Sequence, residues 1–211
     1  MFKYLYPDAV LLIFCKAPIA GQVKTRLIPT LTAEQAMQLH IELSLNTFKK
    51  ATQQPLCPVQ LWCTPSIEHD FFIQAEHDYK LTRWQQQGDD LGERMNHALC
   101  TALKFYKRAV LIGCDSPSLS SQDLASAIIA LNKTTAVFAP AEDGGYVLLG
   151  LNHPQPELFI QMPWGSELVM TETRVRCQQL GIFYHEMPIQ WDVDTPSDLT
   201  RYRLSIHHSI A

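Results

Sequence analysis

Four short charged clusters in this sequence each follow a segment whose pattern predicts a β-strand. The clusters are Lys24-Thr25-Arg26, Asp115-Ser116-Pro117, Asp143-Gly144-Gly145-Tyr146 and Asp192-Val193-Asp194-Thr195-Pro196. In an open α/β sheet, the loops that leave the carboxyl ends of the strands meet at one edge, and ligands bind in the crevice between them. Cations and carboxylates that are far apart in the sequence would then face one pocket. This mixture suits a phosphorylated ligand held together with a divalent metal.

The basic cluster belongs to residues 16–26, which follow the predicted first strand. Phosphates commonly bind at this position of a sheet, because backbone N–H groups and cations converge there. Lys16, Lys24 and Arg26, together with Gly21, suit a diphosphate or a triphosphate. The segment is neither a P-loop nor a dinucleotide-binding fingerprint, since both motifs need more glycines than it holds. The alternative is a basic loop that is only solvated.

Asp115 ends the apolar strand pattern Ala109–Cys114 and is a candidate metal ligand. Ser120 or Ser121 can cap the helix that follows, so that Asp115 is not needed as a cap. Mg²⁺ and Mn²⁺ are bound through one or two carboxylates together with phosphate oxygens. We therefore predict that Asp115 binds a metal and takes part in catalysis.

Asp192 and Asp194 are separated by one residue, so that in an extended segment both side chains point to the same side. Paired like charges repel each other unless a cation lies between them. Both are candidate metal ligands, and Asp192 is the favoured one. Asp194 alternatively caps the next helix, a role for which Thr195 competes.

The segment Asp143-Gly144-Gly145-Tyr146 is typical of a tight turn between two strands. Two glycines also let the backbone approach a ligand closely. Asp143 would then be a catalytic base, and Gly144, Gly145 and Tyr146 would belong to a substrate or acceptor loop. Trp164 is assigned to the same loop region, where it either stacks on a ligand ring or packs in the core.

Residues 88–94 begin a predicted helix. Asp89, Asp90 and Glu93 need no functional explanation there, since acidic residues in the first turn favour the helix dipole. Arg94 has the opposite charge, and we predict that a phosphate or a carboxylate holds it.

Composition limits the class of protein. The chain has 211 residues, of which 46% are hydrophobic and 18% charged, as in a globular domain, and its net charge of −4 argues against nucleic-acid binding. Its longest uncharged apolar run, 9–15, is too short to span a bilayer, and its first residues do not resemble a signal peptide. The six cysteines form no C-x-x-C pair, and Cys15 and Cys114 have no evident histidine partner. We expect reduced thiols and a cytoplasmic protein.

Strand and helix patterns alternate along the chain, which predicts a three-layer α/β/α sandwich with a mixed, mainly parallel sheet in a single domain over residues 1–211. A capping box at Thr32 and Gln35 predicts a helix start. Strands are expected at 10–14, 59–63, 79–84, 109–113, 136–139, 146–151 and 182–187. Helices are expected at 32–47, 66–76, 91–105, 120–131 and 167–180, and from 195 onward.

Taken together, these segments resemble the bacterial family known as domain of unknown function 2064, whose members are described as GT-A-type glycosyltransferase-like and as part of the nucleotide-diphospho-sugar transferase superfamily. The resemblance extends over nearly the whole chain, in order. It is carried by Phe14-Cys15-Lys16-Ala17-Pro18, Gly21, Lys24-Thr25-Arg26-Leu27, Gly88-Asp89-Asp90-Leu91-Gly92-Glu93-Arg94-Met95, Gly113-Cys114-Asp115-Ser116-Pro117, Asp143-Gly144-Gly145-Tyr146 and Asp192-Val193-Asp194-Thr195-Pro196.

The resemblance implies a nucleotide-binding fold of the GT-A type. Asp115 matches the aspartate that meets metal and nucleotide, and Asp192 lies near a second metal position. Lys24 and Arg26 match the basic loop that meets phosphates. The expected activity is the transfer of a glycosyl group from a nucleotide sugar to a small-molecule acceptor, with Mg²⁺ or Mn²⁺ as cofactor. The alternatives are a nucleotidyltransferase, which would join a nucleoside triphosphate to a phosphorylated acceptor, and a non-catalytic nucleotide-binding regulator.

Overall fold

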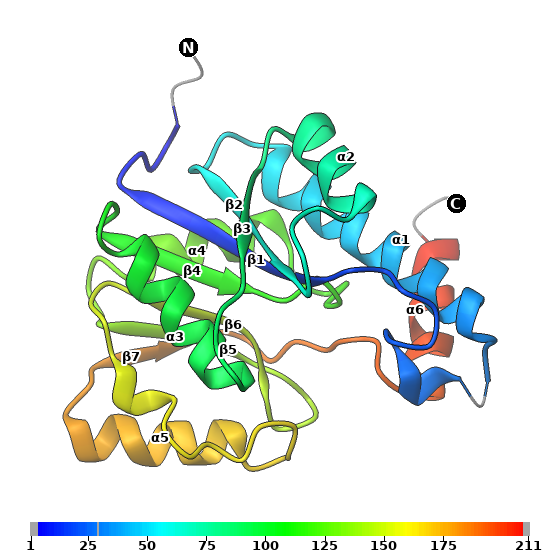
Figure 1. Ribbon diagram of the computed structural model, residues 1–211. Helices are drawn as coiled ribbons and strands as arrows, with labels where there is room; N and C mark the ends of the chain where they lie inside the picture. Colours follow the sequence, from blue (N-terminus) through cyan, green and yellow to red (C-terminus); the bar gives the residue numbers. More distant parts are fainter. Residues whose placement is uncertain (1–3, 29, 209–211) are drawn as a thin grey trace.

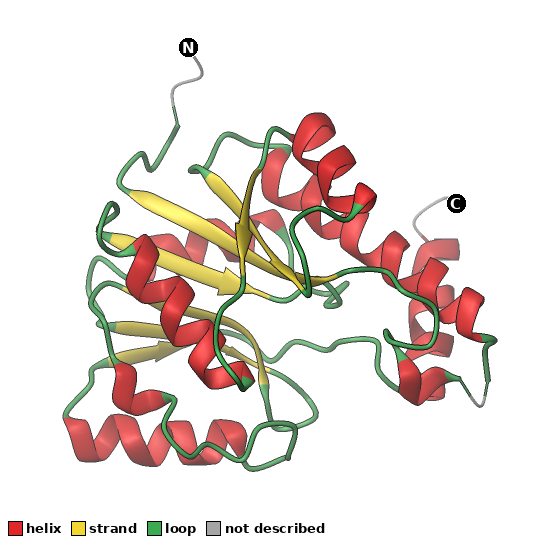
Figure 2. Ribbon diagram, viewed as in Figure 1, coloured by secondary structure: helices red, strands yellow, loops and turns green. Residues whose placement is uncertain are grey.

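A computed structural model describes residues 4–28 and 30–208, and a seven-stranded sheet lies at its centre (Figures 1 and 2). The strands are β1 (Ala9–Lys16), β2 (Val59–Thr64), β3 (Thr82–Gln85), β4 (Arg108–Ile112), β5 (Ala136–Pro140), β6 (Tyr146–Leu151) and β7 (Tyr184–Glu186). The helices are α1 (Ala33–Thr52), α2 (Asp70–Tyr79), α3 (Leu91–Ala102), α4 (Ser121–Ala130), α5 (Val169–Leu180) and α6 (Pro196–His208), with the short 3₁₀ helices η1 (Thr25–Leu27) and η2 (Pro156–Leu158).

The strand order is β3-β2-β1-β4-β6-β5-β7. Only β6 among these strands runs antiparallel to its neighbours β4 and β5, and the other pairs are parallel. The mixed, mainly parallel sheet predicted from the sequence is thereby confirmed. Parallel strands covered on both faces read as continuous apolar runs, which explains why β1 and β4 were evident in the sequence.

Helices cover both faces of the sheet, so that two apolar layers form the core (Figure 2). One layer packs α1, α2 and α4 against the sheet through residues such as Phe48, Phe72 and Leu124. The other layer packs α3 and α5 through residues such as Met95 and Met170. This is the predicted three-layer α/β/α sandwich.

A third apolar cluster joins α6, η1 and the first half of α1 beyond the carboxyl ends of β1 and β4 (Figure 1). Its fully or nearly fully buried members include Leu27, Leu43, Val193 and Tyr202. The cluster fixes two loops of the chain, the one after β1 and the one before α6, beside the edge of the sheet. Both loops carry predicted site residues.

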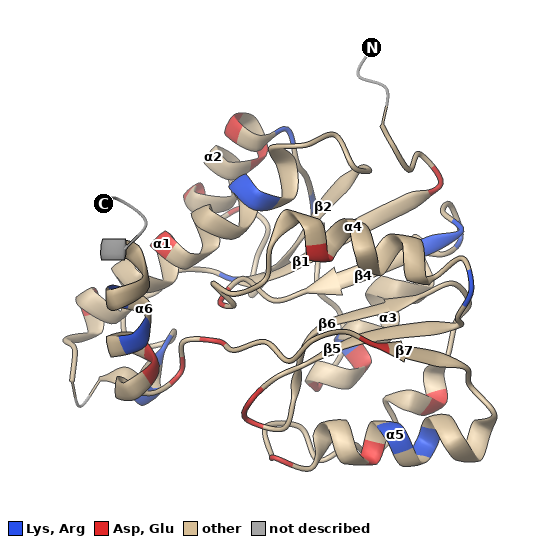
Figure 3. Ribbon diagram, turned by 180° about the vertical axis from the view of Figure 1, so that it is seen from behind, with Lys and Arg blue, Asp and Glu red and all other residues tan. Residues whose placement is uncertain are grey.

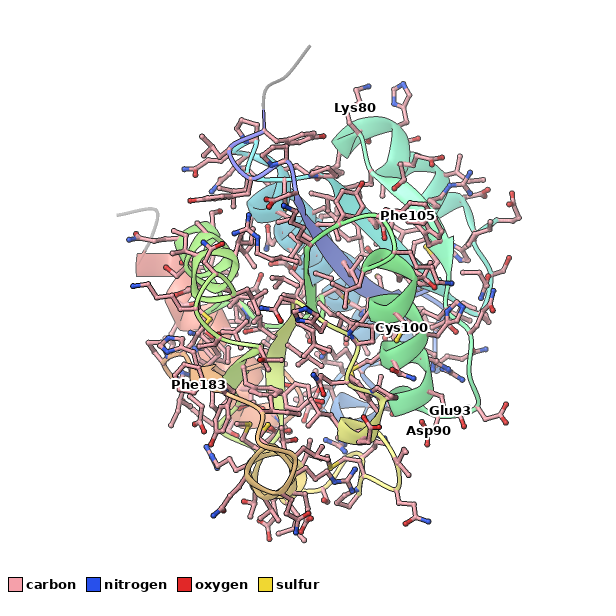
Figure 4. The ribbon with its side chains drawn as sticks, turned by 90° about the vertical axis from the view of Figure 1, so that its left-hand side faces the viewer. Lys80, Asp90, Glu93, Cys100, Phe105 and Phe183 are labelled. Atoms are coloured by element: carbon pink, nitrogen blue, oxygen red, sulfur yellow. The ribbon has the colours of Figure 1, made fainter. Side chains whose placement is uncertain are left out.

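The ends of several helices follow from their caps. The predicted capping box is confirmed, since Thr32 Oγ1 accepts from the Gln35 N–H at 3.2 Å and Gln35 Oε1 accepts from the Thr32 N–H at 2.9 Å. The predicted start of the second helix at Ser66 is wrong, because His69 caps α2 instead. The predicted helix 91–105 is too long, because α3 ends at Ala102 and the side chain of Phe105 is exposed beyond it (Figure 4). The strand expected at 79–84 starts only at Thr82.

Among the helices of residues 4–28 and 30–208, none combines the length and the apolar character that crossing a bilayer requires.

Candidate active site

A cavity of about 300 Å³ lies at the carboxyl ends of β1 and β4, between the loop after β1 and the segment before α6. Its lining brings together five of the predicted site residues, Lys16, Lys24, Arg26, Asp115 and Asp194. The other residues of the lining are Phe14, Gln22, Val23, Thr25, His40, Gly113 and Cys114. Three of the four charged clusters therefore meet at one edge of the sheet, as their positions after strands predicted, whereas the cluster 143–146 is not part of this lining.

Lys24 occupies the centre of this site. Its Nζ lies 2.9 Å from Asp115 Oδ2 and 2.9 Å from Asp194 Oδ1, and only 5% of its side chain is exposed. Burial alone would lower the pKa of Lys24, but the charges of Asp115 and Asp194 raise it above its ordinary value. Lys24 also has left-handed backbone dihedrals, with φ 49° and ψ 38°, which are uncommon for a residue other than glycine. The fold therefore holds this ammonium group in place between two carboxylates.

Arg26 lies at the mouth of the cavity. Its guanidinium donates to Asp194 Oδ2 at 3.2 Å, and 64% of its side chain is exposed. A cation that is bound at one end and open to solvent at the other can reach an incoming anion. This position of Arg26 is compatible with both predictions for the loop, namely that it binds phosphates or that it is only solvated.

Three carboxylates form the acidic side of the site. Asp115, Asp192 and Asp194 each contribute one oxygen to a group in which all oxygens lie within 4.8 Å of one another. Burial, together with the negative charges of Asp115, Asp194 and Asp143, raises the pKa of Asp192 to about 7. Burial would also raise the pKa of Asp115, yet Lys24 holds it below its ordinary value. The cluster has more negative charge than Lys24 alone compensates.

Hydrogen bonds attach the segment around Asp192 to the loop after β4. Ser116 Oγ and Ser118 Oγ donate to the Trp191 carbonyl at 2.9 and 3.1 Å, and the Val193 N–H donates to the Asp115 carbonyl at 3.2 Å. The carboxylates therefore come from two loops that are fixed to each other. The path of these loops between the sheet and α6 is marked by acidic ribbon segments in Figure 3.

The role of Asp194 as a helix cap, which the sequence left open, is taken by its neighbours. Thr195 Oγ1 accepts from the Asp198 N–H at 3.4 Å, and Asp198 Oδ2 accepts from the Thr195 N–H at 2.7 Å. This reciprocal pair caps α6. The carboxylate of Asp194 is thereby available to Lys24 and Arg26.

The loop after β1 is closed on itself. Lys16 Nζ donates to the Gln22 carbonyl at 2.8 Å, and Gly21 has a positive φ of 78° in the turn between them. His40 of α1 donates from Nε2 to the Lys16 carbonyl at 2.8 Å, since a carbonyl can only accept. The predicted phosphate residues Lys16 and Gly21 thus shape the loop from which Lys24 reaches the cavity.

The predicted glycine turn connects β5 and β6. Asp143 Oδ1 accepts from the Gly145 N–H at 2.9 Å, as is typical of aspartate in turns. Gly144 has a φ of +88°, and a Cβ atom there would lie 2.1 Å from the Glu167 carbonyl oxygen. Only glycine fits this close approach to the start of α5, whose Met170 N–H donates to the Gly144 carbonyl at 2.8 Å. The turn has a structural role, and the catalytic role of Asp143 stays a prediction.

Tyr146 and Trp164 lie next to each other, with their ring centroids 6.4 Å apart and their planes perpendicular. Trp164 also stacks on Phe159 and covers Gly92 of α3, where a Cβ atom would lie 2.6 Å from the indole Nε1. The Nε1 atom is buried and has no hydrogen-bond partner within the described chain. The two aromatic residues predicted for an acceptor loop are therefore neighbours, packed between α3 and α5.

Arg94 is placed apart from the cavity lining. Its Nε donates to the Gly88 carbonyl at 2.9 Å, which closes the loop before α3. At the same end of α3, Asp90 caps the helix and Glu93 accepts from the Asp89 N–H, as the structural explanation of these acids predicted (Figure 4). A phosphate-binding role for Arg94 stays a prediction.

Sequence reasoning missed the histidine of the site. His40 Nε2 lies 3.9 Å from Cys15 Sγ, and these two residues form a buried group with Cys114. The expectation that Cys15 and Cys114 lack a histidine partner is therefore wrong. His40 was hard to recognise because it lies on the buried face of α1 with Leu43, Ser44 and Thr47, where a histidine reads as a core residue. The available signal was that both cysteines directly precede charged site residues, Cys15 near the end of β1 and Cys114 two residues after β4.

Comparison with known proteins agrees with this geometry. Residues 47–166 match the model of a family described as "Uncharacterized protein conserved in bacteria (DUF2064)". Among curated proteins, none matches the chain.

Several solved structures are similar in fold. A protein of Desulfovibrio desulfuricans G20, provisionally described as a nucleotide-diphospho-sugar transferase, superposes with a TM-score of 0.84 at 29% identity, covering 92% of this chain and 85% of its own. A CMP:2-keto-3-deoxy-manno-octonic acid synthetase in complex with CTP superposes with a TM-score of 0.61 at 12% identity, covering 96% and 99%. A Mycobacterium tuberculosis H37Rv protein in complex with manganese superposes with a TM-score of 0.56 at 13% identity, covering 92% of this chain and 97% of its own. The predicted fold of the nucleotide-diphospho-sugar transferase type is thereby confirmed.

Proposed function

The chain belongs to the bacterial family of domain of unknown function 2064, and from this premise we propose that it is a metal-dependent transferase that binds a nucleotide sugar and moves its glycosyl group to a small-molecule acceptor. The observation that carries the proposal is the cavity in which Lys24 and Arg26 meet Asp115 and Asp194, with Asp192 beside it. Cations and carboxylates in one cleft suit a diphosphate and a metal together. The similarity to the Desulfovibrio desulfuricans protein supports the same class of activity.

The acidic side of the site fits a hard divalent cation. Mg²⁺ and Mn²⁺ prefer oxygen ligands, and Asp115, Asp192 and Asp194 supply three carboxylates within 4.8 Å of one another. The pKa of Asp192 is raised first by burial and then by the neighbouring carboxylates, whose negative charge a cation would relieve. We assign Asp115, Asp192 and Asp194 as the residues that would hold this ion. When bound, it would neutralise the charge that develops on the departing diphosphate.

The basic residues bind and orient the diphosphate. Arg26 is exposed and meets the phosphates first, whereas Lys24 is buried against Asp115 and Asp194. Once the carboxylates have another cation, the Lys24 ammonium is released to donate to a phosphate oxygen. Charged hydrogen bonds of this kind stabilise a leaving group that gains negative charge as the glycosidic bond breaks.

The turn between β5 and β6 forms the acceptor side of the proposed site. Asp143 is close enough to Asp192 for their charges to interact, and it takes the proton of the acceptor hydroxyl in the proposed reaction. Gly144 and Gly145 let the backbone approach the acceptor, and Tyr146 and Trp164 supply ring surfaces beside it. Nucleotidyl transfer would use the same cleft. The single glycine of residues 16–26 favours glycosyl transfer over it, since nucleotidyltransferases usually have a glycine-rich first loop.

The experiment is a turnover screen with Mn²⁺, in which the full chain is incubated with nucleotide sugars or with nucleoside triphosphates. Release of a nucleoside diphosphate from a nucleotide sugar supports the proposal, and Asp115→Asn should abolish the release. Asp78→Asn, which alters an exposed carboxylate of α2, is the matched control and should leave it unchanged. Pyrophosphate release from a triphosphate would replace the proposal by nucleotidyl transfer. Binding without any turnover would replace it by a nucleotide-binding regulator.

A further inference from the structure

Two cysteines lie side by side at the inner end of the cavity. β1 and β4 pair in parallel with Ile13 opposite Ile112, and Cys15 and Cys114 each follow two residues later. Their side chains therefore project to the same face of the sheet, toward α1. The two sulfur atoms and one ring nitrogen of His40 all lie within 4.8 Å of one another.

The two thiols differ in their access to solvent. Both residues are buried, with 1% and 5% of their surface exposed, but Cys114 belongs to the lining of the cavity beside Asp115. Cys15 lies behind it and contacts Ser44 Oγ at 3.5 Å. A small solute in the cavity would therefore meet Cys114 first, with Cys15 in position to react next.

The same geometry argues against a metal on this group. His40 Nε2 is the ring nitrogen near the sulfurs, and it donates its proton to the Lys16 carbonyl at 2.8 Å. A nitrogen that carries a proton has no lone pair for a metal. Without His40 as a third metal ligand, the two adjacent thiols are better placed to form a disulfide bond with each other.

We propose that Cys15 and Cys114 form a reversible disulfide when a hydroperoxide enters the cavity. Cys114 sulfur attacks the peroxide, the O–O bond breaks, and a sulfenic acid and one water form when hydrogen peroxide is the oxidant. Cys15 sulfur then attacks Cys114 sulfur, the S–O bond breaks, and the departing hydroxide takes the Cys15 proton as a second water. The two thiols supply the two electrons that reduce the peroxide, and a dithiol reductant restores them.

The strand geometry permits this bond and predicts its effect. Neighbouring strands lie about 4.8 Å apart, within the Cα separation of roughly 4.4–6.8 Å that disulfides require, and the last paired residues, Ile13 and Ile112, come two positions before the cysteines. The S–S bond measures about 2.05 Å, so that forming it draws the two sulfurs together. Asp115 directly follows Cys114, and Lys16 directly follows Cys15, so that both sides of the cavity shift. The disulfide is therefore expected to weaken nucleotide binding, a consequence that rests on the proposed function.

The test uses the full chain, treated with hydrogen peroxide, alkylated with N-ethylmaleimide and digested with trypsin. Peptide 4–16 holds Cys15 as its only cysteine and peptide 109–133 holds Cys114 as its only cysteine. Mass spectrometry should find these two peptides linked, and dithiothreitol should separate them. Cys63 is the matched control, since it lies opposite Cys15 on β2 but its thiol donates to the Leu61 carbonyl.

Cys63→Ser should keep the link, and Cys15→Ser should lose it. If a variant fails to fold, the peptides of the wild-type protein are sufficient to decide whether the disulfide forms. No link, or a link from peptide 4–16 to peptide 51–80, which carries Cys57 and Cys63, would overturn the disulfide. Protection of both thiols by added Zn²⁺ at one ion per chain would overturn it in favour of a metal site.

Calorimetry with UDP and Mn²⁺ then separates the disulfide from the proposed function. The reduced chain should bind UDP, and the linked chain should bind it about tenfold more weakly or not at all, a loss of roughly 1.4 kcal/mol or more. Equal binding by both forms would overturn the predicted effect on the site. If the link forms but neither form binds any nucleoside diphosphate, the disulfide stands and the proposed function fails.

Discussion

Replacing Lys24 by methionine removes a buried cation and leaves Asp115 and Asp194 facing each other. Deleting one partner of a buried ion pair costs about 3–5 kcal/mol, because the remaining charge is uncompensated. Here the two carboxylates are 33% and 32% exposed, so that solvent screens part of the repulsion. We therefore expect a loss of about 2–3 kcal/mol in the free energy of unfolding of the metal-free protein. For a domain of this size the melting temperature should fall by roughly 4–12 °C.

A divalent cation should reverse this loss. Mn²⁺ is expected to bind the carboxylates of Lys24→Met more tightly than those of the wild type, because no ammonium group competes for them. At about a hundred times its dissociation constant, it stabilises the fold by roughly 2.7 kcal/mol, which is enough to restore the wild-type melting temperature. The assay is thermal unfolding of both proteins, each in EDTA and in Mn²⁺.

Lys50→Met is the matched control for this experiment. Lys50 is also partly buried, but its Nζ donates to the carbonyls of Pro117 and Leu119 at 2.6 and 2.9 Å. Its loss should destabilise the protein, and Mn²⁺ should shift its melting temperature no more than that of the wild type. The reasoning is refuted if Lys24→Met melts at the wild-type temperature in EDTA, or if Mn²⁺ shifts it no more than it shifts the wild type.

Two further predictions concern the charged residues around Lys24. Arg26→Ala should leave stability nearly unchanged, because exposed ion pairs contribute little, but should weaken binding of a nucleoside diphosphate about ten- to a hundredfold in calorimetry. Unchanged affinity would exclude a phosphate contact. Asp192→Asn should stabilise the metal-free protein at about pH 8 but not at about pH 4. The pKa of Asp192 is raised from 3.8 to about 7 in the folded protein, so between these pH values the unfolded state binds fewer protons and folding loses stability as the pH rises. Asparagine has no charge to lose, so this cost disappears in the variant. Melting curves in EDTA that show the same gain at both pH values would contradict this.

Strand-end position was sufficient to predict that Lys24, Arg26, Asp115, Asp192 and Asp194 gather, although it predicted the same for Asp143, which does not line the cavity. Asp115 follows an apolar run that is buried on both faces, and loops at the carboxyl ends of such strands converge. The family motifs added the expected fold type. The sequence did not reveal what each side chain contacts, because Lys24 meets partners that are 91 and 170 residues away. From the sequence, a basic loop is expected to bind a phosphate or to be solvated. Only the folded structure shows that two carboxylates neutralise the charge of Lys24.

Local rules also left some alternatives open and missed one residue. The choice between Asp194 and Thr195 as the cap of α6 depends on one rotamer, and the structure gives the cap to Thr195. His40 was not considered, since a histidine on an apolar helical face usually belongs to the core. For Trp164 the sequence allows both stacking on a ligand and packing, and its contact with Gly92 of α3 cannot be foreseen from residues so far apart in the sequence.

The central claim, that a metal on Asp115 joins a nucleotide to this cleft, is tested most directly by melting curves of wild type and Asp115→Asn with the best nucleotide ligand, in Mn²⁺ and in EDTA. The account predicts that saturating ligand raises the wild-type melting temperature by roughly 5–10 °C in Mn²⁺ and by much less in EDTA. Asp115→Asn should fold and should lose most of the metal-dependent shift, since asparagine keeps the shape of the side chain and removes its charge. Equal shifts of both proteins, with and without metal, would contradict the account and leave Asp115 as a structural residue.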